Sequence, residues 1–172
     1  MNECLKVLKT RRSVKRFKPD PVPENLLSEI LEAGKNAPTG MNYQSPVMVA
    51  VTNPETINEI SNLLKKVRGT DKEPLYNAPC VIVVLADSDM FTYTHDGSLV
   101  MGNLLNAAHS LGLGACWIHR AKEAFETEEG KKLMKKWGLK ESFVGIGNCI
   151  LGYPDIIPEE KVHKDDYIIY DK

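Results

Sequence analysis

The chain has 172 residues, of which 42% are apolar and 26% are charged, and its formal net charge is −1. This length fits one domain over residues 1–172, and the charge balance gives no signal for a nucleic-acid or membrane partner. No apolar run reaches the roughly 18 residues of a membrane span, and the N-terminus lacks the pattern of a signal peptide. We therefore expect a cytoplasmic protein.

Hydrophobic spacing predicts the secondary structure in chain order. Helices are expected over residues 3–10, 24–36, 54–66, 95–111 and 122–136. Strands are expected over residues 46–52, 80–86, 115–118 and 143–151. A polar, mobile loop is expected over 67–77, and the tail after Pro154 ends in a strand-like run over 167–170. Because strict βαβ alternation is absent, the order favours an α+β fold with helices on a mixed sheet.

Cysteines and histidines give no sign of a metal site. The cysteines form no C-x-x-C pair, and three of them lie in apolar strand-like runs, so we expect reduced and mostly buried thiols: Cys4, Cys80, Cys116 and Cys149. The histidines lack the spacing of metal ligands. No motif of nucleophilic or metal-assisted hydrolysis occurs.

A basic run from Arg11 to Arg16 follows the first predicted helix. If the chain is extended there, Arg11, Ser13 and Lys15 lie on one side. Two cations and a hydroxyl on one face suit a phosphate monoester. The alternative is a set of solvated cations that complement the negative end of the helix dipole.

Two further segments could surround a ligand. The first runs from Pro38 to Pro46 and combines a hydroxyl, a glycine and two amides, which suit a ring edge with alternating acceptors and donors. Gly40 would let the backbone approach a flat ligand. The second runs from Leu111 to His119, where a helix turns into a strand through two glycines. Ordinary turn composition is the alternative explanation for both segments.

Taken in order, these segments resemble the nitroreductase family of flavoproteins. The family motifs and their counterparts are R-R-S-x-R-x-F at 11–17, A-P-S-x-x-N-x-Q-P at 37–46, A-P-x-x-I-V-V at 78–84, G-L-G-x-C-W-I at 112–118 and L-G-Y-P at 151–154. The resemblance covers roughly residues 8–164. It implies an α+β fold and an intertwined homodimer with FMN sites at the interface.

The resemblance also implies the site residues. The phosphate and ribityl chain would be held by Arg11, Arg12, Ser13 and Lys15. The partner subunit would flank the ring with Pro38, Thr39, Gly40 and Asn42. The other side of the ring would be lined by Trp117, Ile118 and His119, with a backbone N–H near the reactive nitrogen N5. In the tail, Lys161 and His163 stand where the family usually adds a Lys/Arg pair to the phosphate. Separately, the tail over 155–172 has too little apolar content for a core of its own, so we expect it to pack on the partner subunit.

The implied activity is ping-pong transfer of hydride or electrons from NADH or NADPH through FMN to small oxidants such as nitroaromatics or quinones. No catalytic side chain is implied, because the flavin performs the chemistry. Departures from the family pattern include Thr39, Ser45 and His163. The short 67–77 segment implies an open pocket. Flavin cleavage, deiodination and a non-catalytic flavin-binding or partner-binding module stay as alternatives.

Overall fold

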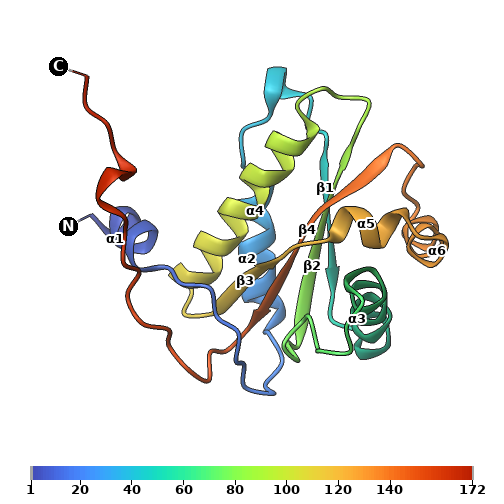
Figure 1. The fold of residues 1–172 in the computed structure, drawn as a ribbon, viewed down its shortest axis with the longest axis horizontal. Helices are drawn as coiled ribbons and strands as arrows, with labels where there is room; N and C mark the ends of the chain where they lie inside the picture. Colours follow the sequence, from blue (N-terminus) through green and yellow to red (C-terminus); the bar gives the residue numbers. More distant parts are fainter. Residues whose placement is uncertain (1, 172) are drawn as a thin grey trace.

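The computed structural model describes residues 2–171 (Figure 1). The helices are α1 (Glu3–Thr10), α2 (Glu24–Lys35), α3 (Pro54–Arg68), α4 (Tyr93–Ser110), α5 (Ala121–Glu126) and α6 (Glu128–Lys136). The strands are β1 (Pro46–Val51), β2 (Cys80–Asp87), β3 (Gly114–Ile118) and β4 (Phe143–Gly152). The short 3-10 helices are η1 (Gly40–Asn42) and η2 (Asp165–Tyr167). Within the described residues, no helix has both the length and the apolar character needed to span a membrane.

The strands form one sheet in the order β1-β2-β4-β3, and each neighbouring pair is antiparallel. The prediction of a mixed sheet is therefore wrong for these strands. Parallel pairing in residues 2–171 is confined to an isolated bridge between Ser13 and Ala115. The predicted α+β class is confirmed, since the sheet is flanked by helices on both faces.

Figure 1 shows helices on both faces of the sheet, and a cluster of buried apolar side chains lies between the sheet and each helical layer. Helices α2 and α4 pack on one face, and α3, α5 and α6 pack on the other. The central strand β2 is buried along its length except at its last residue, which fits its continuous run of β-branched residues. Three cysteines are buried free thiols, as expected: Cys80, Cys116 and Cys149. Burial raises the pKa of Cys80 to about 12.

The predicted helix over 122–136 is in fact two helices, α5 and α6, that break at Thr127. The Thr127 hydroxyl donates to the carbonyl of Ala124 at 2.7 Å and accepts from the N–H of Gly130 at 3.1 Å. It thus ends one helix and caps the next. A Cβ on Gly130 would overlap the carbonyl oxygen of Ala124, so this corner requires glycine.

The predicted strand at 167–170 is also wrong. Residues 165–167 form η2, and no described part of the chain pairs as a strand with the residues that follow. In Figure 1 the tail leaves the sheet, passes beside α1 and ends away from the body. It exposes large apolar side chains, including Ile157, Val162 and Ile169 at 84%, 92% and 90%. Within the described residues this segment pairs with neither edge strand of the sheet, β1 or β3, so it does not form a strand.

Candidate functional site

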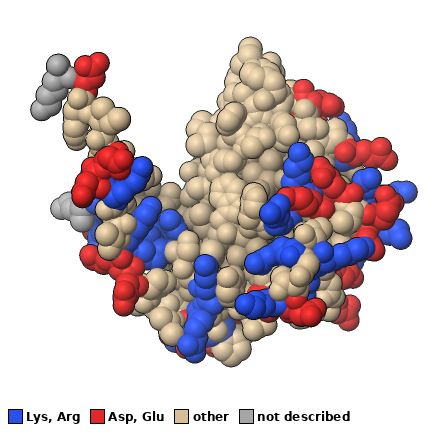
Figure 2. Space-filling model, in the orientation of Figure 1, with Lys and Arg blue, Asp and Glu red and all other residues tan. Residues whose placement is uncertain are grey.

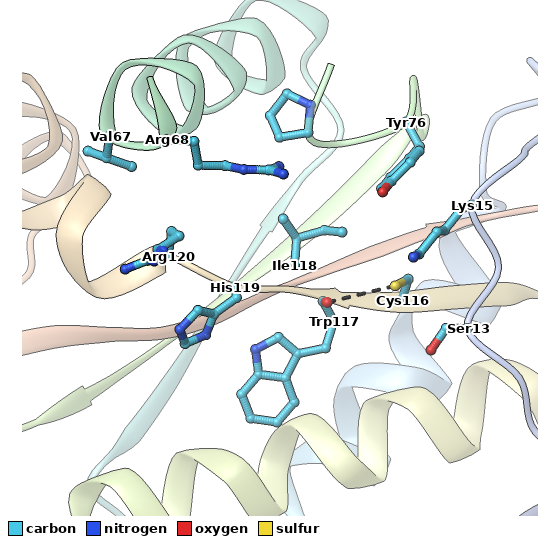
Figure 3. A pocket seen from close by; sticks show the side chains of 11 residues that line it. Ser13, Lys15, Val67, Arg68, Tyr76, Cys116, Trp117, Ile118, His119 and Arg120 are labelled. Carbon is cyan, nitrogen blue, oxygen red and sulfur yellow. Dashed lines mark hydrogen bonds between the residues drawn. The ribbon is translucent and has the colours of Figure 1, made fainter. Parts of the chain in front are cut away.

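A cavity of about 630 Å³ opens beside the edge strand β3 (Figure 3). This volume is typical of a small-ligand site. Its walls are the segment 13–15, the end of α3, the loop that follows α3, and the strand β3 with the two residues after it. The lining residues are Ser13, Lys15, Val67, Arg68, Pro74, Tyr76, Cys116, Trp117, Ile118, His119 and Arg120.

The backbone at Val14 fixes the basic segment against β3. Its N–H donates to the carbonyl of Ala115 at 3.0 Å, and the Val14 side chain is buried. A Cβ on Gly114 would lie 2.8 Å from that side chain, so a glycine there permits the close approach. Since side chains alternate along an extended chain, Ser13 and Lys15 both face the cavity. The prediction that these two share a side is confirmed.

Arg11 and Arg12 lie beside this cavity rather than in it. They line a neighbouring pocket of about 190 Å³. The Nη1 atom of Arg11 is buried and has no hydrogen-bond partner within residues 2–171. Arg12 donates from Nη1 to the carbonyls of Lys9 and Arg11, both at 2.9 Å, and from Nε to the carbonyl of Glu159 at 3.2 Å. Arg12 therefore complements the end of α1, which was the alternative interpretation of the basic run.

The cavity is cationic. Lys15, Arg68 and Arg120 line it, and none of the described lining residues is acidic. The Lys15 ammonium lies 5.7 Å from the centre of the Tyr76 ring, within the range of a cation–π contact. Tyr76 and Arg120 have left-handed backbones, with φ of 53° and 75°. Such conformations are uncommon outside glycine and tend to occur at functional sites.

The loop over 67–77, which was expected to be mobile, is held at Glu73 by hydrogen bonds and an ion pair. The Glu73 carboxylate accepts from the Ser61 hydroxyl at 2.8 Å and from the Leu75 N–H at 3.1 Å, and it pairs with Lys65 at 2.9 Å. Burial raises the pKa of Glu73, but these donors outweigh burial and leave the pKa below its usual value. The anchored carboxylate fixes Tyr76 at the wall of the cavity.

The edge strand β3 supplies the floor of the cavity. The Trp117 indole packs over Gly147, where a Cβ would overlap the indole nitrogen Nε1. Beyond the bridge at Ala115, the outer edge of β3 pairs with no other described strand, so its outward backbone groups can bind a ligand. Burial raises the pKa of Cys116 despite opposing effects of Ser13, Lys15 and Arg11. This thiol is therefore not an activated nucleophile.

The segment 38–46 lies at the opposite edge of the sheet, where it leads into β1. The buried Asp96 carboxylate accepts from the Gly40 N–H at 2.9 Å, the Ser45 hydroxyl at 3.0 Å and the Thr92 hydroxyl at 2.9 Å. A Cβ on Gly40 would lie 2.6 Å from Thr92 Oγ1. Packing against Thr92 therefore explains this glycine within one chain, whereas the sequence suggested the approach of a ligand.

This segment presents its other residues to solvent. Met41, Asn42 and Gln44 have left-handed backbones, with φ between 49° and 58°. Pro38 and Asn42 are exposed, and Thr39 accepts from the Gln44 N–H at 3.1 Å. Within one chain these residues and the cationic cavity lie on opposite edge strands. Three strand spacings, about 14 Å, separate those edges.

The predicted tail residues lie outside the cavity. The Lys161 ammonium is 6.0 Å from the centre of the Tyr167 ring, and the His163 ring meets the same ring edge-on, with 6.0 Å between the two centres. Neither residue lines a described pocket. The structure of one chain thus unites Ser13, Lys15, Trp117, Ile118 and His119, and it leaves the other predicted residues elsewhere.

Sequence reasoning missed Arg68, Tyr76 and Arg120. Arg120 directly follows the segment ending at His119, so extending that motif by one residue would have found it. Arg68 and Tyr76 belong to no motif, and their place depends on how the end of α3 packs beside β3. No local pattern in the sequence encodes that contact.

An antiparallel sheet between two helical layers, with a cationic cavity at one edge strand, defines an α+β ligand-binding protein. A model of the Nitroreductase family matches residues 8–153. A protein of Archaeoglobus fulgidus, provisionally named NADH dehydrogenase/NAD(P)H nitroreductase, is 31% identical over 90% of this chain and 87% of its own length. The chain belongs to the nitroreductase family.

Solved structures agree with this assignment. The crystal structure of a nitroreductase with bound FMN from Bacteroides fragilis has a TM-score of 0.90 and 29% identity, and each chain covers 100% of the other. A nitroreductase with bound FMN from Desulfitobacterium hafniense gives a TM-score of 0.90 and 28% identity, again over 100% of both chains. The FMN reductase of Bacillus subtilis is 24% identical over 100% of this chain and 77% of its own length.

Proposed function

We propose that the chain is an FMN-dependent oxidoreductase that passes electrons from NADH or NADPH to small oxidants such as nitroaromatics or quinones. The observation that carries this proposal is the cavity beside β3, where Ser13 and Lys15 meet a free strand edge and no described lining residue is acidic. Family membership supplies the reaction class. The free thiols of the cysteines fit a reducing compartment, and we propose the cytoplasm.

The residues present fit FMN. Its phosphate is an anion, and the adjacent Lys15 ammonium and Ser13 hydroxyl are suited to bind it. The buried Nη1 of Arg11 lacks a partner among the described residues, and a phosphate oxygen would satisfy it. Backbone groups at the outer edge of β3, near Trp117 and Ile118, would bind the polar edge of the ring.

Bound FMN would supply the hydride acceptor and donor that the side chains of the cavity lack. The protein's own residues then bind and orient. Lys15 and Ser13 hold the anionic end, and the Trp117–His119 backbone holds the ring edge. The anchored Tyr76 limits the opening on the α3 side.

We further propose that the working unit is a homodimer with two sites. The predicted ring-flanking residues, Pro38 to Asn42, and the cavity lie at opposite sheet edges, so a second copy is needed to bring them together. The tail over 155–172 would pack on that copy, within a single domain over 1–172. From there it could deliver Lys161 and His163 to the partner's phosphate.

The surface area supports this assembly. The chain exposes 10724 Å², whereas a compact monomer of 19.2 kDa exposes about 8,400 Å². The excess, roughly 2,300 Å² per chain or about 4,600 Å² for two chains, is within the total area that obligate homodimers bury. Figure 2 shows the tail standing off from the body, with an uncharged, concave surface between them.

The test is the visible spectrum of the purified protein. We expect a flavin band that bleaches when NADH or NADPH is added without oxygen and returns when an oxidant is added. Colourless protein whose melting temperature does not change with added FMN would refute the proposal. A stable flavin band with no bleaching by either nicotinamide would identify a flavin-binding module without turnover.

A further inference from the structure

One of the cationic side chains that line the cavity beside β3 has no partner among the described residues. Figure 3 shows Ser13 and Lys15 at one end, His119 and Arg120 at the other, and Arg68 reaching in from the α3 side. Arg120 forms an ion pair with Glu123. Lys15 contacts the Tyr76 ring and belongs to the proposed phosphate end. Arg68 makes no hydrogen bond, ion pair or ring contact with any residue that the structure describes.

A comparison along α3 shows that Arg68 differs from its neighbours. The last turn of α3 carries three cations, which the negative end of the helix favours. Lys65 pairs with Glu73 at 2.9 Å, and Lys66 pairs with Glu129 at 2.9 Å. Both point to carboxylates outside the cavity. Arg68 alone of the three lines the cavity and has no described carboxylate as a partner.

We propose that Arg68 is a subsite for a carboxylate or phosphate group on the second ligand, the oxidant or the nicotinamide. This inference rests on the proposed function. The phosphate of FMN accounts for one anion, and Ser13, Lys15 and Arg11 are suited to it. Arg68 is then the uncompensated charge in the rest of the cavity, and a guanidinium binds oxyanions through two parallel donors. The enzyme would therefore favour anionic second ligands over neutral ones of the same shape.

The first arm of the experiment uses the FMN-loaded, oxidised protein and measures the binding of an oxidant without turnover. The variant is Arg68→Gln, which removes the charge and keeps most of the length. The matched control is Lys66→Gln, which removes a cation from the same helical turn outside the cavity. Isothermal titration compares 4-nitrobenzoate with the neutral 4-nitrobenzamide. A second arm compares NADPH with NADH through the ratio of their kcat/KM values.

We expect Arg68→Gln to weaken the binding of the preferred anionic ligand about 10- to 100-fold, because charge-assisted hydrogen bonds are lost. The affinity for the neutral isostere should change less than about twofold. In Lys66→Gln, the affinities for both ligands should also change less than about twofold. A change confined to nitrobenzoate identifies a carboxylate-bearing oxidant as the source of the anion. A change confined to the NADPH to NADH ratio identifies the 2′-phosphate of the nicotinamide.

Two results would overturn the subsite. The first is no difference between wild type and Arg68→Gln in either arm, with the nitrobenzoate to nitrobenzamide affinity ratio and the NADPH to NADH ratio both unchanged. The second is a loss of FMN affinity in Arg68→Gln, which would assign the arginine to the cofactor. FMN affinity is measured separately from the apoprotein by fluorescence quenching, and we expect it to stay within about twofold. A wild-type protein that fails to bind FMN would instead refute the proposed function, so the two failures are distinguishable.

Discussion

The carboxylate of Asp96, in the first turn of α4, accepts a hydrogen bond of 2.9 Å from the backbone N–H of Gly40, a residue 56 positions earlier. The same carboxylate accepts from the hydroxyls of Ser45 and Thr92. Asp96 is 2% exposed. One buried anion therefore organises the whole segment that we propose to flank the ring in the partner subunit.

Replacing Asp96 with alanine should loosen this segment and destabilise the fold. Three donors would lose their acceptor in a buried place, and we expect the free energy of unfolding to fall by about 2–3 kcal/mol. Urea unfolding measures that change. FMN affinity should fall as well, by about 10-fold, because the segment would no longer hold its left-handed backbone. The matched control is Asp20→Ala, which removes an exposed acid and should leave both quantities unchanged.

Urea unfolding and FMN affinity test different parts of this prediction. A loss of stability with unchanged FMN affinity would show that the segment over 38–46 lies outside the cofactor site. Unchanged stability would show that the buried hydrogen bonds of Asp96 contribute little to the fold. The conservative variant Asp96→Asn should lie between wild type and Asp96→Ala, since it keeps one acceptor atom.

The hydrogen bonds and ion pair of Glu73 should make the stability of the fold depend on pH. Burial raises its pKa, but donors from Lys65, Ser61 and Leu75 outweigh burial, so the folded pKa lies below the ordinary value of about 4.3. The unfolded chain then binds more protons in the interval between the two pKa values. The stabilisation by Glu73 is therefore fully present above the unfolded pKa and is lost as the pH falls through the folded pKa.

The measurement compares wild type with Glu73→Gln by urea unfolding between pH 7 and pH 3. The difference in free energy should be about 1 kcal/mol near pH 7 and should shrink below pH 4. Taking the difference removes the effect of other carboxylates, including Asp96, whose pKa is lowered in the same direction. A difference that stays constant across this range would contradict the shifted pKa.

Gly114→Ala should displace the basic segment from β3. The new Cβ would lie 2.8 Å from the Val14 side chain, so one of the two must move. We expect destabilisation of about 1–3 kcal/mol, as is typical of overpacking, together with weaker FMN binding. Val14→Ala alone should lower the free energy of unfolding by about 1–2 kcal/mol, because it leaves a cavity.

The double variant Val14→Ala/Gly114→Ala provides the control. If the clash with Val14 is the cause, the smaller side chain makes room, and the double variant should lose less stability than the sum of the single changes. Additive losses would show that Gly114 is required for another reason.

The sequence predicted the parts of the site that depend on local order. Alternation along an extended chain placed Ser13 and Lys15 on one side, and a buried apolar run identified β2. It did not predict the direction of strand pairing, since the same apolar runs suit parallel and antiparallel sheets. It also missed the break at Thr127, where the side chain of a single residue ends one helix and begins another.

The remaining errors concern contacts between distant segments. The sequence pattern marks Gly40 as special, but the neighbour that requires a glycine is Thr92, which no local pattern identifies. Arg68 was missed because its role depends on the end of α3 packing beside β3. The tail was predicted as a strand because Tyr167 to Tyr170 form an apolar run, but the tail passes beside α1 and pairs with neither edge strand of the sheet.

The tail gives the last prediction, which concerns assembly. Ile168 and Ile169 are 65% and 90% exposed in one chain, which is costly unless a partner covers them. We expect the variant Ile168→Asp/Ile169→Asp to shift the protein from dimer to monomer at micromolar concentration, as measured by analytical ultracentrifugation. Asn62→Asp, which adds a negative charge to the exposed surface of α3, should leave the dimer intact.

Loss of the dimer should also release FMN, because residues 38–42 and the cationic cavity lie at opposite edges of the sheet in one chain. The flavin spectrum and the sedimentation coefficient should therefore change together across a dilution series. A monomer that retains FMN would show that one chain holds the cofactor unaided. A variant that remains dimeric would show that the apolar end of the tail is not part of the interface.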